Sequence, residues 1–130
     1  MEHLTPKETV DLLENNPNAL FIDCRSEMEF LFVGHPKGAM HVPWNDGPDW
    51  EINPHFTGEI RKLAGHVQDR PVVLICRSGN RSVDAGKILE SIGFSRVYNV
   101  LYGFEGELDN QHHRGTINGW RFDGLPWEQC

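Results

Sequence analysis

The sequence lacks several features that would place it in a special class of protein. Its 130 residues contain no apolar run of about 18 residues, the length that a membrane-spanning helix needs. The first residues also lack the basic and then apolar segments of a secretory signal peptide. Cysteine is scarce: Cys24, Cys76 and Cys130 are widely spaced, and none belongs to a C-x-x-C pair. A disulfide framework and a zinc site are therefore disfavoured, and we expect a cytoplasmic protein with a free thiol.

Basic residues are also few, with 12 Lys and Arg against 19 Asp and Glu, so the formal net charge is −7. This balance argues against nucleic acid and anionic membranes as partners. The charge is not evenly spread, however. Residues 70–97 hold five basic and two acidic residues and carry +3, which leaves −10 for the rest of the chain. That segment can therefore attract a small anion within an otherwise acidic protein.

The length fits one domain, since domains commonly hold about 100 to 150 residues, and no repeat or long linker divides the chain. Two capping boxes, Thr5 with Glu8 and Ser26 with Glu29, predict helix starts. Helices are predicted over about 6–15, 26–33, 54–64 and 82–92, and strands over 19–22, 39–42, 71–75 and 96–100. Strands that alternate with helices predict an α/β fold with a central parallel sheet of about five strands and helices on both faces.

The segment 75–82 joins the most apolar strand, which we expect at the centre of the sheet, to the next helix. Ligands of open α/β sheets bind beyond the carboxyl ends of the strands, so a site is expected here. A turn that contains glycine can point its amides at an anion, and a helix start adds partial positive charge. Arg77 and Arg81 add two full charges. These surroundings favour the thiolate of Cys76, which is the nucleophilic form, and can hold an anionic substrate.

A plainer interpretation of the same residues is a buried cysteine that ends a strand and precedes an ordinary polar loop. The two arginines, the glycine and the helix start within six residues favour the nucleophile instead.

Four segments, in the right order and spacing, resemble the rhodanese family of sulfurtransferases. The first is the loop C-R-S-G-N-R-S at 76–82, which resembles the family's active-site loop, and the second is the strand and helix opening at 21–30, with Cys24 where valine is usual. The third is the segment 34–43, which resembles G-H-I-P-G-A apart from Pro36 and Lys37. The fourth is the segment 119–126, which contains the closing pattern W-x-x-x-G-L-P. The resemblance covers nearly the whole chain.

The resemblance implies one rhodanese domain over residues 1–130, without cofactor or metal. Cys76 would be the catalytic residue: it would take a sulfane sulfur from a small anionic donor as a persulfide and pass it to a thiol or protein acceptor. Arginine directly after the cysteine is typical of members that use thiosulfate. The substrate would be bound by the remaining loop residues, which are Arg77, Ser78, Gly79, Asn80, Arg81 and Ser82.

Two alternatives remain beside the thiosulfate sulfurtransferase. The same fold is shared with phosphatases whose loop is one residue longer, so a small phosphatase or arsenate reductase is one alternative. The four residues between Cys76 and Arg81 should form a smaller cradle, which suits sulfur better than phosphate. The other alternative is a non-catalytic interaction or sulfur-carrier module, but such modules commonly lack the cysteine.

Other polar residues have supporting roles or none. Asp23 and Arg25 are expected at the same sheet edge, where they either stiffen the cysteine loop or form an ordinary ion pair. Residues 103–109 should lie beside that loop, and their carboxylates should discourage a highly anionic acceptor. Residues 112–114, His-His-Arg, fit an exposed loop better than a metal site, because adjacent histidines seldom converge.

Aromatic residues in the loops after the strands can wall the entrance of the site, although about half of them should belong to the core. They are Trp44, Trp50, Phe56, Tyr102 and Phe104. Cys24 is expected as a small buried hydrophobe and Cys130 as a mobile tail thiol. A further hypothesis is that one of these two thiols resolves or protects Cys76.

Overall fold

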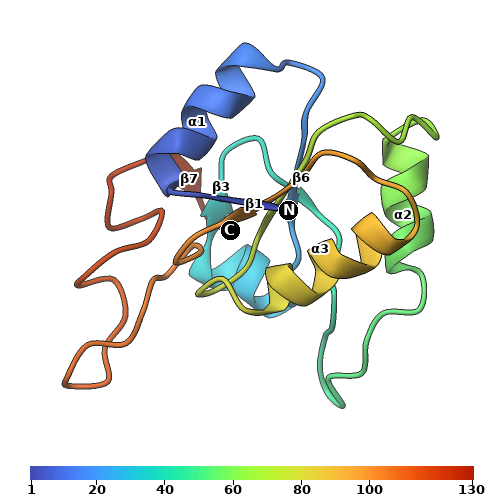
Figure 1. Ribbon diagram of the computed structural model, residues 1–130. Coiled ribbons are helices and arrows are strands. Elements are labelled where there is room, and N and C mark those ends of the chain that lie inside the picture. Colours follow the sequence, from blue (N-terminus) through green and yellow to red (C-terminus); the bar gives the residue numbers. More distant parts are fainter.

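Strands and helices alternate along the computed structural model, which describes residues 1–130 (Figure 1). In chain order the elements are β1 (Glu2–Leu4), α1 (Pro6–Asn15), β2 (Leu20–Asp23), the π-helical turn η1 (Glu29–Val33), β3 (His35–Pro36), β4 (Met40–His41), α2 (Phe56–Leu63), β5 (Val72–Ile75), α3 (Arg81–Ser91), β6 (Val97–Val100) and β7 (Trp127–Glu128). No helix combines the length and the apolar character needed to cross a bilayer.

Five strands form one sheet in the order β1-β6-β5-β2-β4, and all of its pairings are parallel. The predicted α/β class and parallel sheet are therefore confirmed. β5 occupies the centre, as its apolar and β-branched sequence predicts, and all four of its residues are buried. A strand in this position has both faces covered, which explains why its sequence is apolar throughout and does not alternate.

Two apolar cores lie on opposite faces of the sheet, because successive residues of a strand point to opposite sides. Val72 and Leu74 pack on one face with residues of α2 and α3. Val73 and Ile75 pack on the other face with Trp120, and α1 adds partly buried residues there. Figure 1 shows α1 on one side of the sheet and α2 and α3 on the other.

Both predicted capping boxes are present. The Glu8 amide donates to the Thr5 hydroxyl at 3.2 Å, and the Thr5 amide donates to the Glu8 carboxylate at 2.9 Å. Ser26 and Glu29 exchange the same pair of bonds, at 3.3 and 3.2 Å. The second box begins a turn that becomes π-helical over η1.

Three short strands were not predicted from the sequence. β1 has three residues and pairs with β6, and β3 and β7 are two-residue strands that pair antiparallel as a separate small sheet. Such strands are too short to show a hydrophobic period. They form because distant parts of the chain offer unpaired backbone groups, which local sequence does not reveal.

Asp23 and Arg25 form an ion pair with both side chains fully buried. Arg25 Nη2 lies 2.7 Å from Asp23 Oδ2, and Arg25 Nε donates to Asp23 Oδ1 at 3.0 Å. Arg25 also donates to the Gly34 carbonyl, and its guanidinium lies 4.6 Å from the centre of the Phe104 ring. The pair therefore joins the end of β2 to two loops and acts in the core of the fold, not as part of the reacting group.

Removal of the Asp23 charge should destabilise the protein strongly, because it leaves the Arg25 charge buried without a counter-ion. We expect Asp23→Asn to lower the free energy of unfolding by about 3–5 kcal/mol in urea denaturation. Asp69→Asn, which removes a charge from an exposed side chain, is the matched control and should change it by less than about 0.5 kcal/mol. Equal effects of the two variants would contradict a structural role for the pair.

Candidate active site

The loop 76–82 lies where the sequence predicts a site, between the carboxyl end of β5 and the start of α3. Of the segment 103–109 predicted to lie beside it, residues 103–106 contact the loop, whereas Glu107 and Asp109 bond to residues 111–118. The Phe104 amide donates to the Cys76 carbonyl at 2.8 Å, and the Glu105 amide donates to the Arg77 carbonyl at 2.9 Å. Gly103 permits this approach, because a Cβ there would overlap the Cys76 carbonyl oxygen and its φ of 63° suits glycine.

The Cys76 thiol lies in a small cradle made by its own loop. The Gly79 amide donates to Cys76 Sγ at 3.1 Å, and Ser82 Oγ lies 3.2 Å from the same sulfur. Cys76 is only 1% exposed. An N–H that points at the sulfur stabilises negative charge on it, so the cradle suits a thiolate reached by a slender group.

A chain of buried polar groups continues from Ser82 away from the loop. The Ser82 hydroxyl donates to Asn99 Oδ1 at 2.5 Å, and Asn99 Nδ2 lies 3.1 Å from His3 Nδ1. Ser82 and Asn99 are almost fully buried. Asn99 was not predicted as a site residue, although an asparagine inside the apolar strand Val97–Val100 is a detectable sign of a buried hydrogen bond.

The two arginines of the loop differ in their partners. Arg81 donates from both Nη atoms to the two carboxylate oxygens of Glu29, each at 2.8 Å. Arg77 is exposed and has no acidic group within 4.0 Å. The charge of Arg81 is thus held by the fold, whereas the charge of Arg77 is free to meet a ligand.

The other predicted loop residues contribute less directly. Ser78 is half-buried and has no side-chain hydrogen bond, and the Asn80 side chain does not cap α3. Gly79 contributes its backbone amide to the thiol, at a φ of 103°. Among the residues 78–80, backbone geometry therefore matters more than side-chain chemistry.

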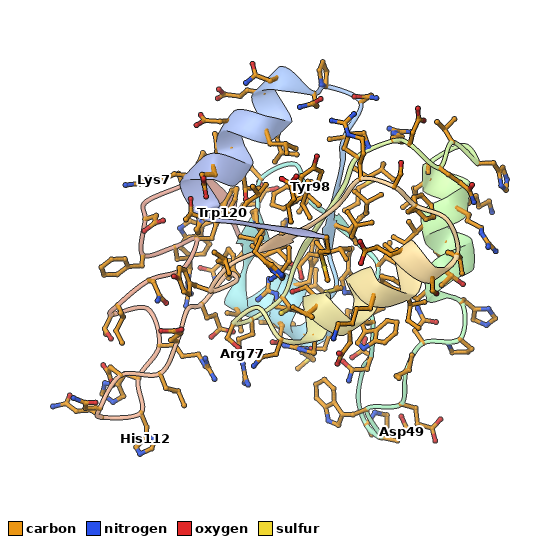
Figure 2. All side chains as sticks on the ribbon, in the orientation of Figure 1. Lys7, Asp49, Arg77, Tyr98, His112 and Trp120 are labelled. Atoms are coloured by element: carbon orange, nitrogen blue, oxygen red, sulfur yellow. The ribbon has the colours of Figure 1, made fainter.

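A cavity of about 610 Å³ opens above the loop. Its walls come from the loop itself, from the segment after β2, and from two projecting segments whose tips, Asp49 and His112, lie on either side of Arg77 in Figure 2. The lining residues are Ser26, Met28, Glu29, Val33, Trp50, Arg77, Arg81, Glu105 and Arg114. Cys76 is buried and not among them, whereas Arg77 and Arg81 of the same loop are.

The aromatic residues divide between core and cavity, as predicted. Trp44, Phe56 and Phe104 are buried, whereas Trp50 is 51% exposed and lines the cavity. Tyr102 is half-buried. Only Trp50 of the five therefore walls the cavity.

The predicted exposure of residues 112–114 is correct for the two histidines and wrong for the arginine. His112 and His113 are exposed at the tip of their segment, whereas Arg114 is half-buried and lines the cavity. The difference arises because Arg114 turns back and donates to the Gly106 carbonyl at 2.6 Å. No group of three or more His, Cys, Asp or Glu side chains is placed to hold a metal ion.

The remaining cysteines are free thiols. Cys24 follows β2 directly, and because Asp23 pairs with Ile75 it lies next to Cys76 across the sheet. Its thiol is fully buried and donates to the Ile75 carbonyl at 3.3 Å. Burial, with the neighbouring Cys76, raises the pKa of Cys24 well above its usual value, so it stays neutral. Cys130 is exposed, and its amide donates to the Leu31 carbonyl.

The Glu29–Arg81 pair should make stability depend on pH. Burial alone would raise the pKa of Glu29, but the hydrogen bonds and charge of Arg81, with bonds from Ser26, lower it from 4.5 to about 2. A folded-state pKa below the unfolded one means that the stabilisation is complete above about pH 4.5 and is lost as the pH falls towards 2. The difference in unfolding free energy between wild type and Glu29→Gln should therefore shrink across this window.

Urea denaturation at several pH values measures that difference. Glu14→Gln, at an exposed position of α1, is the control and should show no such trend. A Glu29→Gln difference that stays constant between pH 5 and pH 2 would contradict the ion pair as its source.

Known proteins resemble this chain over most of its length. A family model for the rhodanese-like domain matches residues 5–108. An uncharacterized protein of Rickettsia conorii is 28% identical, with 98% of each chain covered. The thiosulfate sulfurtransferase GlpE of Glaesserella parasuis is 30% identical over 79% of this chain and 82% of its own.

Solved structures agree with this relationship. The crystal structure of Rv0390 from M. tuberculosis has a TM-score of 0.87 and 40% identity, and the alignment covers 100% of this chain and 98% of that one. The polysulfide-sulfur transferase of Wolinella succinogenes has a TM-score of 0.68 and 27% identity, with 100% and 80% covered. The chain therefore belongs to the rhodanese-like family, as its motifs predict.

Proposed function

We propose that this protein is a sulfurtransferase that uses thiosulfate or a similar small anionic donor and carries the sulfur as a persulfide on Cys76. The observation that carries the proposal is the position of the thiol: it accepts the Gly79 amide in the loop before α3, and the unpaired Arg77, next to Cys76 in sequence, lines the cavity. The names of GlpE, a thiosulfate sulfurtransferase, and of the Wolinella polysulfide-sulfur transferase support a sulfane-sulfur donor.

The reaction takes two displacements. The Cys76 thiolate attacks the outer sulfur of thiosulfate, the S–S bond breaks, and its electron pair leaves with sulfite. An acceptor thiolate then attacks the outer sulfur of the persulfide, which returns Cys76 to the thiolate and leaves the acceptor as a persulfide. The thiol is 1% exposed, so a terminal sulfur atom reaches it more readily than a bulky group does. Neither step needs a general base once the thiolate has formed.

The arrangement of Arg81 disfavours a phosphatase. A tetrahedral phosphate carries charge on several oxygens and needs guanidinium donors within the cradle. Arg81 directs both Nη atoms to Glu29, and the cradle around Cys76 Sγ is left with the Gly79 amide and Ser82. A sulfur atom, which needs fewer donors than phosphate, fits this cradle better.

A non-catalytic module is also disfavoured. The Cys76 thiol is bonded within a loop that three backbone bonds from residues 104–106 hold in place. We expect the acceptor to be a small thiol or a protein thiol, in a reducing compartment such as the cytoplasm, where the three free cysteines stay reduced.

Incubation with thiosulfate should add one sulfur atom to Cys76. We expect a mass increase of about 32 Da by intact mass spectrometry, located to the peptide that contains Cys76 and reversed by a thiol. Cys76→Ser should abolish the increase. A mass increase that persists in this variant would show that Cys76 is not the sulfur carrier. Hydrolysis of an aryl phosphate by a wild-type protein that forms no persulfide would contradict sulfur transfer and favour a phosphatase.

The other cysteines provide matched controls. Cys24→Val and Cys130→Ser should each retain persulfide formation, because neither thiol contacts the sulfur of Cys76 through a hydrogen bond. If both variants also match the wild type in turnover and in recovery from peroxide, the hypothesis of a resolving thiol should be abandoned.

Arg77→Ala should weaken the use of an anionic donor selectively. We expect kcat/KM for thiosulfate to fall about tenfold, the order of one lost charge-assisted hydrogen bond. The rate of alkylation by uncharged iodoacetamide should fall much less. Arg96→Ala, which removes an exposed arginine at the opposite end of the sheet, is the control for net charge. Equal losses for the two reagents would contradict an anion-binding role.

A further inference from the structure

Arg114 reaches the active-site cavity from an ordered projecting loop, residues 107–118. Asp109 organises this loop: its carboxylate accepts the amides of Gln111 and His113 at 2.8 and 2.9 Å and the hydroxyl of Thr116 at 2.7 Å. Figure 2 shows His112 at the tip, away from the sheet. The internal bonds give the loop a defined shape, so the arginine that it carries has a defined position.

The base of the projecting loop is fastened to the cysteine loop. Arg114 Nη1 donates to the Gly106 carbonyl at 2.6 Å, and the Gly106 amide donates to the Arg77 carbonyl at 3.3 Å. Asn118 closes the base, because the Glu107 amide donates to its side-chain oxygen at 2.9 Å. Gly106 therefore links the Arg114 side chain to the backbone of Arg77 through two hydrogen bonds.

Arg114 and Arg77 are the cations of the cavity that are free to bind a ligand. Arg81 is paired with Glu29, whereas neither Arg77 nor Arg114 has an acidic group within 4.0 Å. Glu105 is the remaining acidic residue of the lining. Two free guanidinium groups against one carboxylate leave the cavity cationic, although the whole chain carries −7.

The cavity is also larger than thiosulfate requires. Thiosulfate has five heavy atoms, whereas pockets of roughly 300–1,000 Å³ hold organic ligands of drug size. The cavity measures about 610 Å³ and has apolar walls from Met28, Val33 and Trp50. Apolar walls around two cations suit a carbon skeleton that bears an anionic group.

We propose that Arg114 binds the carboxylate of an organic sulfur substrate, a thiol acceptor or persulfide whose carboxylate lies several bonds from its sulfur. The inference rests on the proposed function. Arg77, next to Cys76 in sequence, meets charge close to the sulfur, and Arg114, which the projecting loop brings to the cavity lining, meets charge farther from it. The family match ends at residue 108, so this specificity comes from a segment beyond it.

Two aryl disulfides test the subsite without any sulfur-transfer activity. The Cys76 thiolate attacks one sulfur of either reagent, the S–S bond breaks, and an aryl thiolate leaves. Dithiobis(nitrobenzoate) carries a carboxylate on each ring, and dithiodipyridine is uncharged. In protein with Cys130→Ser, which removes the exposed thiol, Arg114→Gln should slow the first reagent about tenfold and change the second less than twofold.

Two further variants separate binding from other effects. Arg114→Lys keeps the charge, so its rate with dithiobis(nitrobenzoate) should fall less than the rate of Arg114→Gln does. Arg96→Gln makes the same change in net charge at the far end of the sheet and should keep the wild-type ratio of the two rates. The proposal is overturned by an unchanged ratio in Arg114→Gln or by an equal change in Arg96→Gln.

A turnover assay then connects the subsite to the substrate class. With thiosulfate as donor, we expect Arg114→Gln to lose about tenfold in kcat/KM for glutathione, which bears carboxylates, and to keep its value for 2-mercaptoethanol. Absence of a persulfide in the wild type would refute the proposed function alone, because the disulfide reagents still report on Arg114. Normal persulfide formation with equal losses for the two acceptors would refute the subsite alone.

Discussion

The parallel pairing of β5 between β2 and β6 is the constraint on which the rest of the site depends. Because the three strands run in the same direction, the residues that follow them meet at one edge of the sheet although they are far apart in sequence. Backbone bonds from Phe104 and Glu105 to the carbonyls of Cys76 and Arg77 then hold the loop against its neighbour. The nucleophile is thus positioned by main-chain contacts, and side chains are left to provide charge and shape.

One carboxylate gives the two loop arginines different functions. Glu29 is placed by its capping bonds with Ser26, and from there it binds both Nη atoms of Arg81. That pair fastens η1 to the start of α3, and it withdraws one positive charge from the site. Arg77 has no such partner, so of the two loop arginines it is the one whose charge is available to a substrate. An acidic protein can therefore present a cationic cavity, since the local arrangement of charges outweighs the total.

The sequence predicted the features that local chemistry determines. The capping box at Thr5, the buried strand Val72–Ile75 and the cysteine loop each depend on neighbouring residues, and each lies where it was expected. The pairing of Arg81 with Glu29 and the return of Arg114 to the cavity were not predictable in this way. The first contact joins residues that are 52 positions apart, and the second depends on how a loop closes on Gly106. Neither contact leaves a periodic pattern in the sequence.

The polar chain that runs from Cys76 through Ser82 and Asn99 to His3 assigns different donors to the two states of the thiol. Ser82 has one hydroxyl proton and gives it to Asn99 Oδ1, so Ser82 can only accept from Cys76, and the Cys76 S–H is the donor. This arrangement suits the protonated sulfur. When that proton leaves, Ser82 offers the sulfur no donor unless its hydroxyl turns, and the Gly79 amide remains as the fixed donor to the thiolate. The polar chain therefore orients the protonated sulfur, and the backbone amide of the loop stabilises the thiolate that reacts.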